Sequence, residues 1–111
     1  MDVRVTRRDI GSRTVVAVEG EIDVSTADVM RDRLAEPIAE QRTDLVVDLL
    51  GVRFMDSTGL GVLVGALKKV RTQGGRLVLV VDSERLLTVL RITALLPLFT
   101  VYATVDEALA G

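Results

Sequence analysis

The first twenty residues of the chain combine an alternation of apolar and polar positions with a turn signal. Val3 and Val5 lie between polar or charged neighbours, and this period of two is typical of a half-buried strand. Residues 9–12 (Asp-Ile-Gly-Ser) favour a turn, and residues 14–18 are again largely apolar. The pattern predicts a β-hairpin at the start of the chain.

Two later apolar runs lack this alternation. Residues 45–49 (Leu-Val-Val-Asp-Leu) and 77–81 (Leu-Val-Leu-Val-Val) are short and almost unbroken. Strands that are covered on both faces have this composition, and such strands usually pair in parallel. We expect both runs in the interior of one sheet.

Apolar positions that recur every three or four residues predict a helix between these strands. Its apolar face consists of Ala27, Met30, Leu34 and Ile38. Ser25, followed by Asp28, signals the start of this helix, because side-chain oxygens can accept hydrogen bonds from the free N–H groups of a first turn. Pro37 lies inside the pattern and is expected to kink or divide the helix.

Three more helices are predicted in the second half of the chain. The first ends at residues 73–75 (Gln-Gly-Gly) and has the apolar positions Leu60, Leu63, Leu67 and Val70. The next begins near Ser83, a short apolar strand follows at 98–102, and the last begins at Thr104, where Glu107 completes a capping box. Strands and helices therefore alternate after the hairpin, which predicts an α/β fold: a mixed, mostly parallel sheet with about four helices.

Composition narrows the class of function. The 111 residues are the usual length of one domain (1–111), and 49% of them are hydrophobic. Cysteine and histidine are absent, which excludes a thiol nucleophile, a Ser-His-Asp triad and the usual zinc sites. A net charge of −2 without a basic run gives no electrostatic basis for direct nucleic-acid binding. Without a signal peptide or an apolar run that spans a bilayer, we expect a cytoplasmic protein that has no membrane contact, metal or cofactor.

The most unusual segment is 54–65 (Phe-Met-Asp-Ser-Thr-Gly-Leu-Gly-Val-Leu-Val-Gly), which places Gly59, Gly61 and Gly65 in the first turns of a helix. Each glycine inside a helix costs about 1 kcal/mol relative to alanine, so another interaction must favour them. Because Gly61 and Gly65 are four residues apart, they share one face, where a close backbone approach is expected.

Two interpretations of this segment differ in their consequences. In the first, Asp56 or Ser57 only caps the helix, and the glycines let the helix lie close to the sheet. In the second, the first turns, which are apolar nearly all round, dock a partner through a surface around Ser57.

Two other interpretations are weaker. Gly59-Leu60-Gly61 with Gly65, and with Asp82 after the next strand, has part of a dinucleotide-binding pattern. Its third glycine is one residue late, and about nine residues separate the predicted strand from the first glycine, where that pattern needs a tight turn. A metal site could be imagined from four acidic residues, but their spacing is not that of a ligand set: Glu21, Asp23, Asp48 and Asp56.

The segment 56–61 (Asp-Ser-Thr-Gly-Leu-Gly), preceded by Phe54-Met55, strongly resembles the phosphorylation-site signature of anti-sigma-factor antagonists, the small stand-alone STAS domains of bacterial partner-switching systems. Three other segments are similar to that family in the same order: 20–23 (Gly-Glu-Ile-Asp), 45–49 and 105–109 (Val-Asp-Glu-Ala-Leu). The resemblance covers essentially the whole chain and implies the STAS fold.

The resemblance also implies a function in transcription and stress regulation. Unphosphorylated antagonists bind an anti-sigma factor that is also a serine kinase of the GHKL type, and this binding releases a sigma factor. Phosphorylation ends the binding, and a PP2C-type phosphatase resets the cycle. By position, the implied phosphoacceptor is Ser57 rather than Thr58. The implied partner-binding residues are Asp23, Asp56, Ser57, Thr58, Gly59, Leu60 and Gly61.

Some alternatives stay open at the level of sequence. A STAS module of another signalling complex, or a small nucleotide-binding domain, would also fit the general pattern. The chain departs from the family at 94–98 (Ala-Leu-Leu-Pro-Leu), where relatives are often more polar and carry a glycine. The apolar surface there is compatible with a monomer or a weak homodimer, and ordinary core packing explains it as well.

Overall fold

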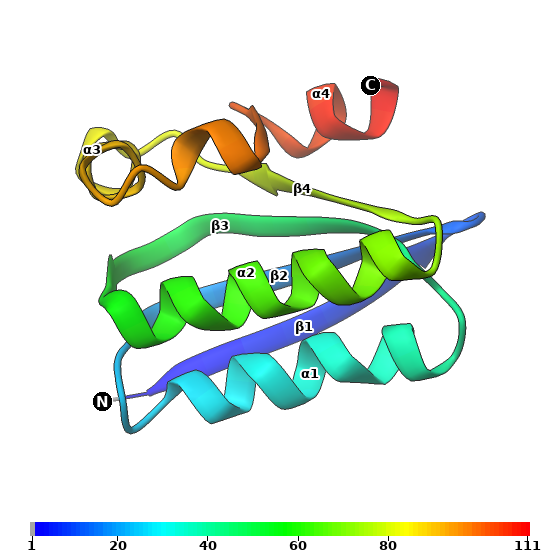
Figure 1. Cartoon of the computed structure of the whole chain (residues 1–111), viewed down its shortest axis with the longest axis horizontal. Helices are drawn as coiled ribbons and strands as arrows, with labels where there is room; N and C mark the ends of the chain where they lie inside the picture. Colours follow the sequence, from blue (N-terminus) through cyan, green and yellow to red (C-terminus); the bar gives the residue numbers. More distant parts are fainter. Residues whose placement is uncertain (1) are drawn as a thin grey trace.

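The computed structural model describes residues 2–111, which form a five-stranded sheet in the order β1-β2-β3-β4-β5 (Figure 1). The first two strands pair antiparallel, and every later neighbour is parallel. The mixed, mostly parallel sheet predicted from the sequence is therefore confirmed. The strands are β1 (Val3–Ile10), β2 (Arg13–Ile22), β3 (Asp44–Met55), β4 (Arg76–Val80) and β5 (Thr100–Tyr102).

Helices cover both faces of this sheet. The α-helices are α1 (Ala27–Ala39), α2 (Ser57–Thr72), α3 (Glu84–Ile92) and α4 (Val105–Ala110), and a short 3-10 helix, η1 (Leu96–Leu98), precedes β5. In Figure 1, α1 and α2 lie side by side over β1, β2 and β3. None of the helices in residues 2–111 is both long enough and apolar enough to cross a bilayer.

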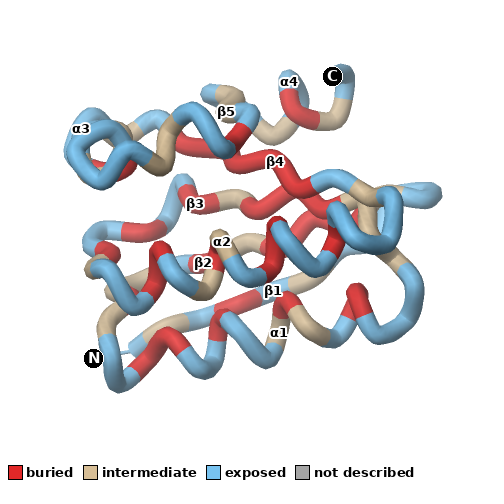
Figure 2. Tube along the Cα trace, in the orientation of Figure 1, coloured by how far each residue is buried: buried red, intermediate tan, exposed pale blue. Residues whose placement is uncertain are grey.

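Alternate residues of the central strands enter two separate apolar clusters. Leu45 and Val47 of β3 belong to the larger cluster, with the buried faces of α1, α2 and α3. Val46 faces the other way and packs with Val15 and with Ala108 of α4. Figure 2 shows the result as buried stripes on the helices and a buried centre of the sheet. The unbroken apolar run of β3 reflects this double cover, as predicted.

The start of α1 differs from the sequence-based expectation. The residue before the helix is Thr26, not Ser25, and its side chain makes no capping hydrogen bond. The Ser25 hydroxyl donates to Asp23 Oδ1 at 2.7 Å, and the Thr26 hydroxyl donates to the Glu21 carbonyl at 2.8 Å. The prediction that Ser25 caps α1 is wrong because acceptors in the preceding loop take these hydroxyls.

Pro37 also behaves differently from the expectation. The helix α1 continues undivided to Ala39, with Pro37 buried in its last turn. Of the two expected effects, a kink or a division, the division does not occur, because α1 runs through Pro37 as one helix. The Pro37 carbonyl then accepts hydrogen bonds from Glu40 N at 3.0 Å and Arg42 N at 2.8 Å, which closes the helix end.

The later helix starts follow the sequence signals. The Ser83 side chain accepts a hydrogen bond from Leu86 N, and the Thr104 side chain accepts one from Glu107 N. Both predicted caps are thus confirmed. The strand β3, in contrast, is longer than the predicted 45–49, because it continues to Met55 beside β2.

Candidate functional site

The parallel pair β2 and β3 brings two acidic residues to the same edge of the sheet. Ile22 and Met55 are the last paired residues of these strands, and Asp23 and Asp56 follow them directly. The backbone N–H of Asp56 donates to the Ile22 carbonyl at 3.1 Å, which holds the two strand ends together. The carboxyl edge of a parallel sheet is where α/β proteins commonly place their functional groups.

Asp56 caps α2. Its backbone is extended, and its carboxylate accepts hydrogen bonds from Thr58 N at 2.9 Å and from Gly59 N at 3.4 Å. A negative charge at this position also interacts favourably with the N-terminal end of the helix dipole. The prediction that Asp56 or Ser57 caps the helix is therefore confirmed for Asp56.

The three glycines of α2 lie in different surroundings. A Cβ at Gly59 would lie 2.6 Å from Met55 Cγ and 2.7 Å from Ile22 Cγ2, so this glycine lets the first turn rest on the strand ends. A Cβ at Gly61 or Gly65 would have no neighbour within 4 Å. The expected close approach at Gly61 and Gly65 is therefore wrong, because that face of α2 does not meet the sheet.

Ser57 is the first residue of α2 and is exposed. Within residues 2–111 its hydroxyl makes no hydrogen bond, so it is open to solvent on a fixed helix end. Thr58 and Gly61 are exposed as well. Leu60, in contrast, is 3% exposed and packs in the core, and Gly59 is buried, so these two residues offer a partner little surface.

Asp23 is held in place by the loop between β2 and α1. Its carboxylate accepts hydrogen bonds from the Ser25 hydroxyl at 2.7 Å and from Ser25 N at 2.9 Å, and Thr26 Oγ1 lies 3.3 Å away. These donors, with the Ser25 hydroxyl first among them, lower the pKa of Asp23. Asp23 therefore presents a fixed negative charge near neutral pH.

Comparison of the sequence with known proteins identifies the family of this chain. The sequence model of the STAS domain matches residues 2–108. This chain belongs to the STAS domain family. It is 48% identical over 95 residues to the anti-sigma-B factor antagonist of Bacillus subtilis, an alignment that covers 86% of this chain and 83% of that protein.

Solved structures support the same STAS fold. A crystal structure of an anti-sigma factor antagonist from Mycobacterium paratuberculosis superimposes with a TM-score of 0.84 at 30% identity, over 98% of this chain and 92% of that one. The phosphorylated form of the Bacillus cell fate determinant SpoIIAA gives 0.75 at 23% identity, over 96% and 97% of the two chains. At that identity, the second likeness shows the fold alone.

Two exposed apolar side chains lie next to the site residues along the chain of this STAS domain. Val24 follows Asp23 and is 77% exposed, and Phe54, two residues before Asp56, is 46% exposed. Neither residue is among the partner-binding residues predicted from the sequence. The sequence does contain a signal for both residues. Val24 lies in a polar loop and Phe54 lies beside the motif, and neither belongs to a periodic apolar face, so neither is expected in the core.

The dinucleotide-binding and metal-site interpretations find little support in the structure of this STAS domain. The gap between strand and first glycine is three residues and not nine, because β3 extends to Met55. Gly59 nevertheless lies inside α2, so the segment is not the glycine-rich turn of a dinucleotide site. Among residues 2–111 there is no group of three acidic side chains close enough together to hold a metal ion.

Proposed function

We propose that this STAS domain is an anti-sigma factor antagonist, which binds an anti-sigma factor while Ser57 is unmodified and releases it once Ser57 is phosphorylated. The observation that carries the proposal is the exposed Ser57 hydroxyl at the start of α2, directly after the capping Asp56 and at the sheet edge where Asp23 follows β2. The names of its relatives, which are antagonists of anti-sigma-B and anti-sigma-F factors, support it. Residues 1–111 act as one domain in the cytoplasm, where sigma factors work.

The binding surface consists of the exposed residues around Ser57. Val24 and Phe54 supply apolar area, and its removal from water by a partner favours a complex. Thr58 and Gly61 continue the surface along α2. The acidic pair at 23 and 56 favours a partner with basic groups opposite.

The modification is a phosphoryl transfer in which this chain is the substrate and not the enzyme. The proposed kinase is the anti-sigma factor itself, of the GHKL type, with ATP as the donor. A bond forms between Ser57 Oγ and the γ-phosphorus, and the bond from that phosphorus to the β,γ-bridging oxygen breaks, so that ADP leaves. The hydroxyl proton passes to a base on the kinase. A PP2C-type phosphatase returns the serine by hydrolysis of the ester.

The phosphate would act at the interface and not on the fold. It adds about −1.5 to −2 charges at neutral pH. The N–H groups of Thr58 and Gly59, which could stabilise an anion, already bind the Asp56 carboxylate. The new charge therefore faces Asp56 and Asp23 as like charges and requires desolvation against a partner. Ser57 lies outside the core, so the fold is expected to persist.

The test is binding and phosphorylation with purified anti-sigma factors. We use the anti-sigma-B factor of Bacillus subtilis and the anti-sigma factors of the chain's own organism as probes, with the Bacillus antagonist as positive control. We expect capture of the wild type with ADP, and with ATP a single phosphate on the peptide that contains Ser57, followed by dissociation. Ser57→Ala should bind without being modified, and Thr58→Ala should be modified like the wild type.

Two results would contradict the proposal. One is a wild-type chain that none of these anti-sigma factors binds, although the Bacillus antagonist is captured. The other is a phosphorylated chain whose affinity for the anti-sigma factor equals that of the unmodified chain.

A further inference from the structure

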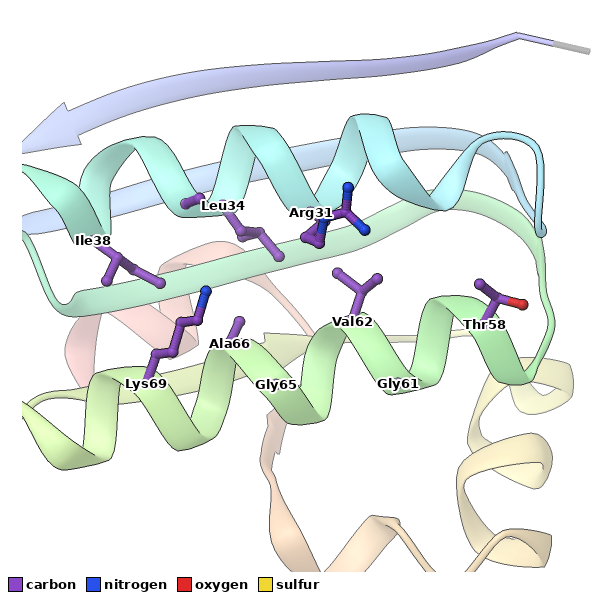
Figure 3. Close-up of a pocket in the computed structure, with 10 residues that line it drawn as sticks. Arg31, Leu34, Ile38, Thr58, Gly61, Val62, Gly65, Ala66 and Lys69 are labelled. Atoms are coloured by element: carbon purple, nitrogen blue, oxygen red, sulfur yellow. The ribbon is translucent and has the colours of Figure 1, made fainter.

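A groove of about 260 Å³ opens between α1 and α2 (Figure 3). Leu34 and Ile38 point into it from α1, and Val62 and Ala66 point into it from α2. Lys69 reaches across the groove from α2, and Arg31 lies at its rim on α1. The groove thus has an apolar floor, which is partly exposed at Val62 and buried at Leu34, Ile38 and Ala66. Two cationic side chains lie at its rim.

Gly61 and Gly65 leave this groove open. Both line it, and a Cβ at either position would have no neighbour within 4 Å. Glycine is the least favourable residue in a helix interior after proline, so a helix gains nothing locally from two of them. Packing within the domain does not require them either. Their structural effect is the open space between the two helices.

We propose that this groove is a second part of the docking surface and takes an amphipathic helix of the anti-sigma factor. Apolar side chains of that helix would enter the open space beside Gly61 and Gly65 and pack against the partly exposed Val62, and one of its carboxylates would pair with Lys69. This inference rests on the proposed function, since it names how the same partner is held.

A helix fits the groove better than an extended segment does. Both walls are α-helices, and their backbone N–H and C=O groups are used within the helices. An extended peptide would find no strand edge to pair with, and its own backbone groups would lose water without gaining partners. A helix satisfies its backbone groups internally, and apolar side chains on one of its faces can enter the space that Gly61 and Gly65 leave open.

The charges at the rim indicate where the partner's carboxylate lies. Arg31 already pairs with Asp28 at 2.9 Å and with Asp32 at 3.6 Å on its own helix. Lys69 has no acidic partner within 4 Å among residues 2–111. The ammonium group of Lys69 is therefore the unpaired cation of the groove, and a carboxylate is the group that complements it.

The groove is continuous with the surface around Ser57. Thr58, the neighbour of Ser57, lines one end, and Lys69 lines the other. The helical rise of 1.5 Å per residue puts these two residues roughly 16 Å apart along α2, the length of about three turns of a partner helix. A partner helix in the groove would end beside Ser57, so one interface could cover both surfaces.

The experiment fills the groove and reverses its charge at positions away from Ser57. Gly65→Met places a side chain in the open space, and Thr72→Met is the control on an exposed position of α2 outside the groove. Lys69→Glu reverses the unpaired charge, and Lys68→Glu makes the same change at an exposed neighbour that does not line the groove. Affinity for the captured anti-sigma factor is measured by calorimetry, and folding by thermal melting.

We expect Gly65→Met and Lys69→Glu to weaken binding at least tenfold, and both controls to stay within about twofold of the wild type. The inference is overturned if Gly65→Met and Lys69→Glu bind as tightly as the wild type, or if Lys68→Glu weakens binding as much as Lys69→Glu. Should Gly65→Met fail to fold, the lysine pair decides alone. If the wild type itself binds no anti-sigma factor, the proposed function fails and this inference fails with it.

Discussion

The glycines of α2 illustrate how one residue type has opposite effects at neighbouring positions. Gly59 lies against Met55 and Ile22 at the strand ends, where a side chain would collide. Gly65 lies in open space on the same helix. Only the first of these glycines is explained by packing, and the second lowers helix stability without a gain inside the domain.

We predict opposite stability changes for alanine at these two positions. Gly59→Ala should lower the free energy of unfolding by about 1–3 kcal/mol, because Met55 and Ile22 must move to admit the methyl group. Gly65→Ala should raise it by up to about 1 kcal/mol through better helix propensity. Urea unfolding measures both, and an equal loss for the two variants would show that Gly65 has a packing role after all.

A second prediction concerns the helix cap. Asp56→Ala should lower the free energy of unfolding by about 1 kcal/mol, because Thr58 N and Gly59 N lose their acceptor. Ser57→Ala, one residue further, should change it by less than about 0.5 kcal/mol, since its side chain is exposed. Thermal unfolding of both variants tests this contrast. A larger loss for Ser57→Ala than for Asp56→Ala would show that Asp56 is not the residue that caps α2.

At the scale of elements, three helices end in the same way. After α1, α2 and α3 the chain takes a positive φ at Gln41 (65°), Gly74 (76°) and Ala94 (60°). After α3, Leu95 N donates to Leu90 O at 2.9 Å and Ala94 N donates to Arg91 O at 3.1 Å, which is a Schellman motif. Only one of the three positions has the glycine that suits this conformation. At Ala94, therefore, an alanine lies in a left-handed backbone conformation.

We predict that exchange of glycine and alanine at these helix ends changes stability in opposite directions. Ala94→Gly should raise the free energy of unfolding by about 1 kcal/mol, because it removes the left-handed strain of an L-residue. Gly74→Ala should lower it by a similar amount, since a Cβ there meets no atom within 4 Å and only the conformational cost remains. Chemical denaturation of both variants checks the signs. A loss in Ala94→Gly would contradict the argument.

The short helix α4 depends on two arginines from the sheet. Arg13 Nη1 donates to Ala108 O at 2.8 Å and to Leu109 O at 2.9 Å, and Arg76 Nη2 donates to Gly111 O at 3.1 Å. Cations near the last carbonyls of a helix also interact favourably with its dipole. A six-residue helix has little stability of its own, so these contacts fix α4 on the sheet.

We predict that Arg13→Ala lowers the free energy of unfolding by about 2 kcal/mol and loosens α4. The Arg13 side chain is only 12% exposed, so its hydrogen bonds to Ala108 and Leu109 are shielded from water. Hydrogen exchange should show lost protection in α4 before any change in β2 and β3. Arg76→Ala, whose side chain is 47% exposed, is the control and should have a smaller effect. Unchanged exchange in α4 would refute the role of Arg13.

At the scale of the whole molecule, an ion cluster joins the edge strand β1 to the end of α1. Arg7 donates to Glu40 at 2.8 Å and 2.9 Å and to Asp9 at 3.0 Å. The hydrogen bonds from Arg7 lower the pKa of Glu40 and the pKa of Asp9, and the same contacts raise the pKa of Arg7. The cluster is at the surface, so its contribution depends on pH and on salt.

The sign of the pH effect follows from the two lowered carboxyl pKa values. Their stabilisation is fully present above the ordinary pKa values of about 4, and it is lost as the pH falls through the lower values of the folded state. The difference in unfolding free energy between the wild type and Arg7→Gln should therefore shrink as the pH falls below about 4. Arg8→Gln, at an exposed neighbour, is the control. A difference that stays constant with pH would contradict this account.

The sequence by itself determined the order and type of the elements. Local apolar patterns show which side chains must be buried, so they predict strands and helices before the packing partners are known. Examples are the period of two in β1, the unbroken run at 45–49 and the apolar face from Ala27 to Ile38. The caps at Ser83 and Thr104 were predictable for the same reason, because a hydroxyl and the N–H group that it accepts from lie within three residues.

Only the tertiary structure decided where competing contacts lie. Ser25 binds Asp23 instead of a helix N–H, β3 reaches Met55 because β2 pairs beside it, and Gly61 and Gly65 face a groove instead of the sheet. In each case the contact depends on whether a second segment of the chain lies next to the residue in the folded structure. A linear pattern records how strongly a residue avoids water, but it does not record which neighbour covers that residue, because the fold alone sets that neighbour.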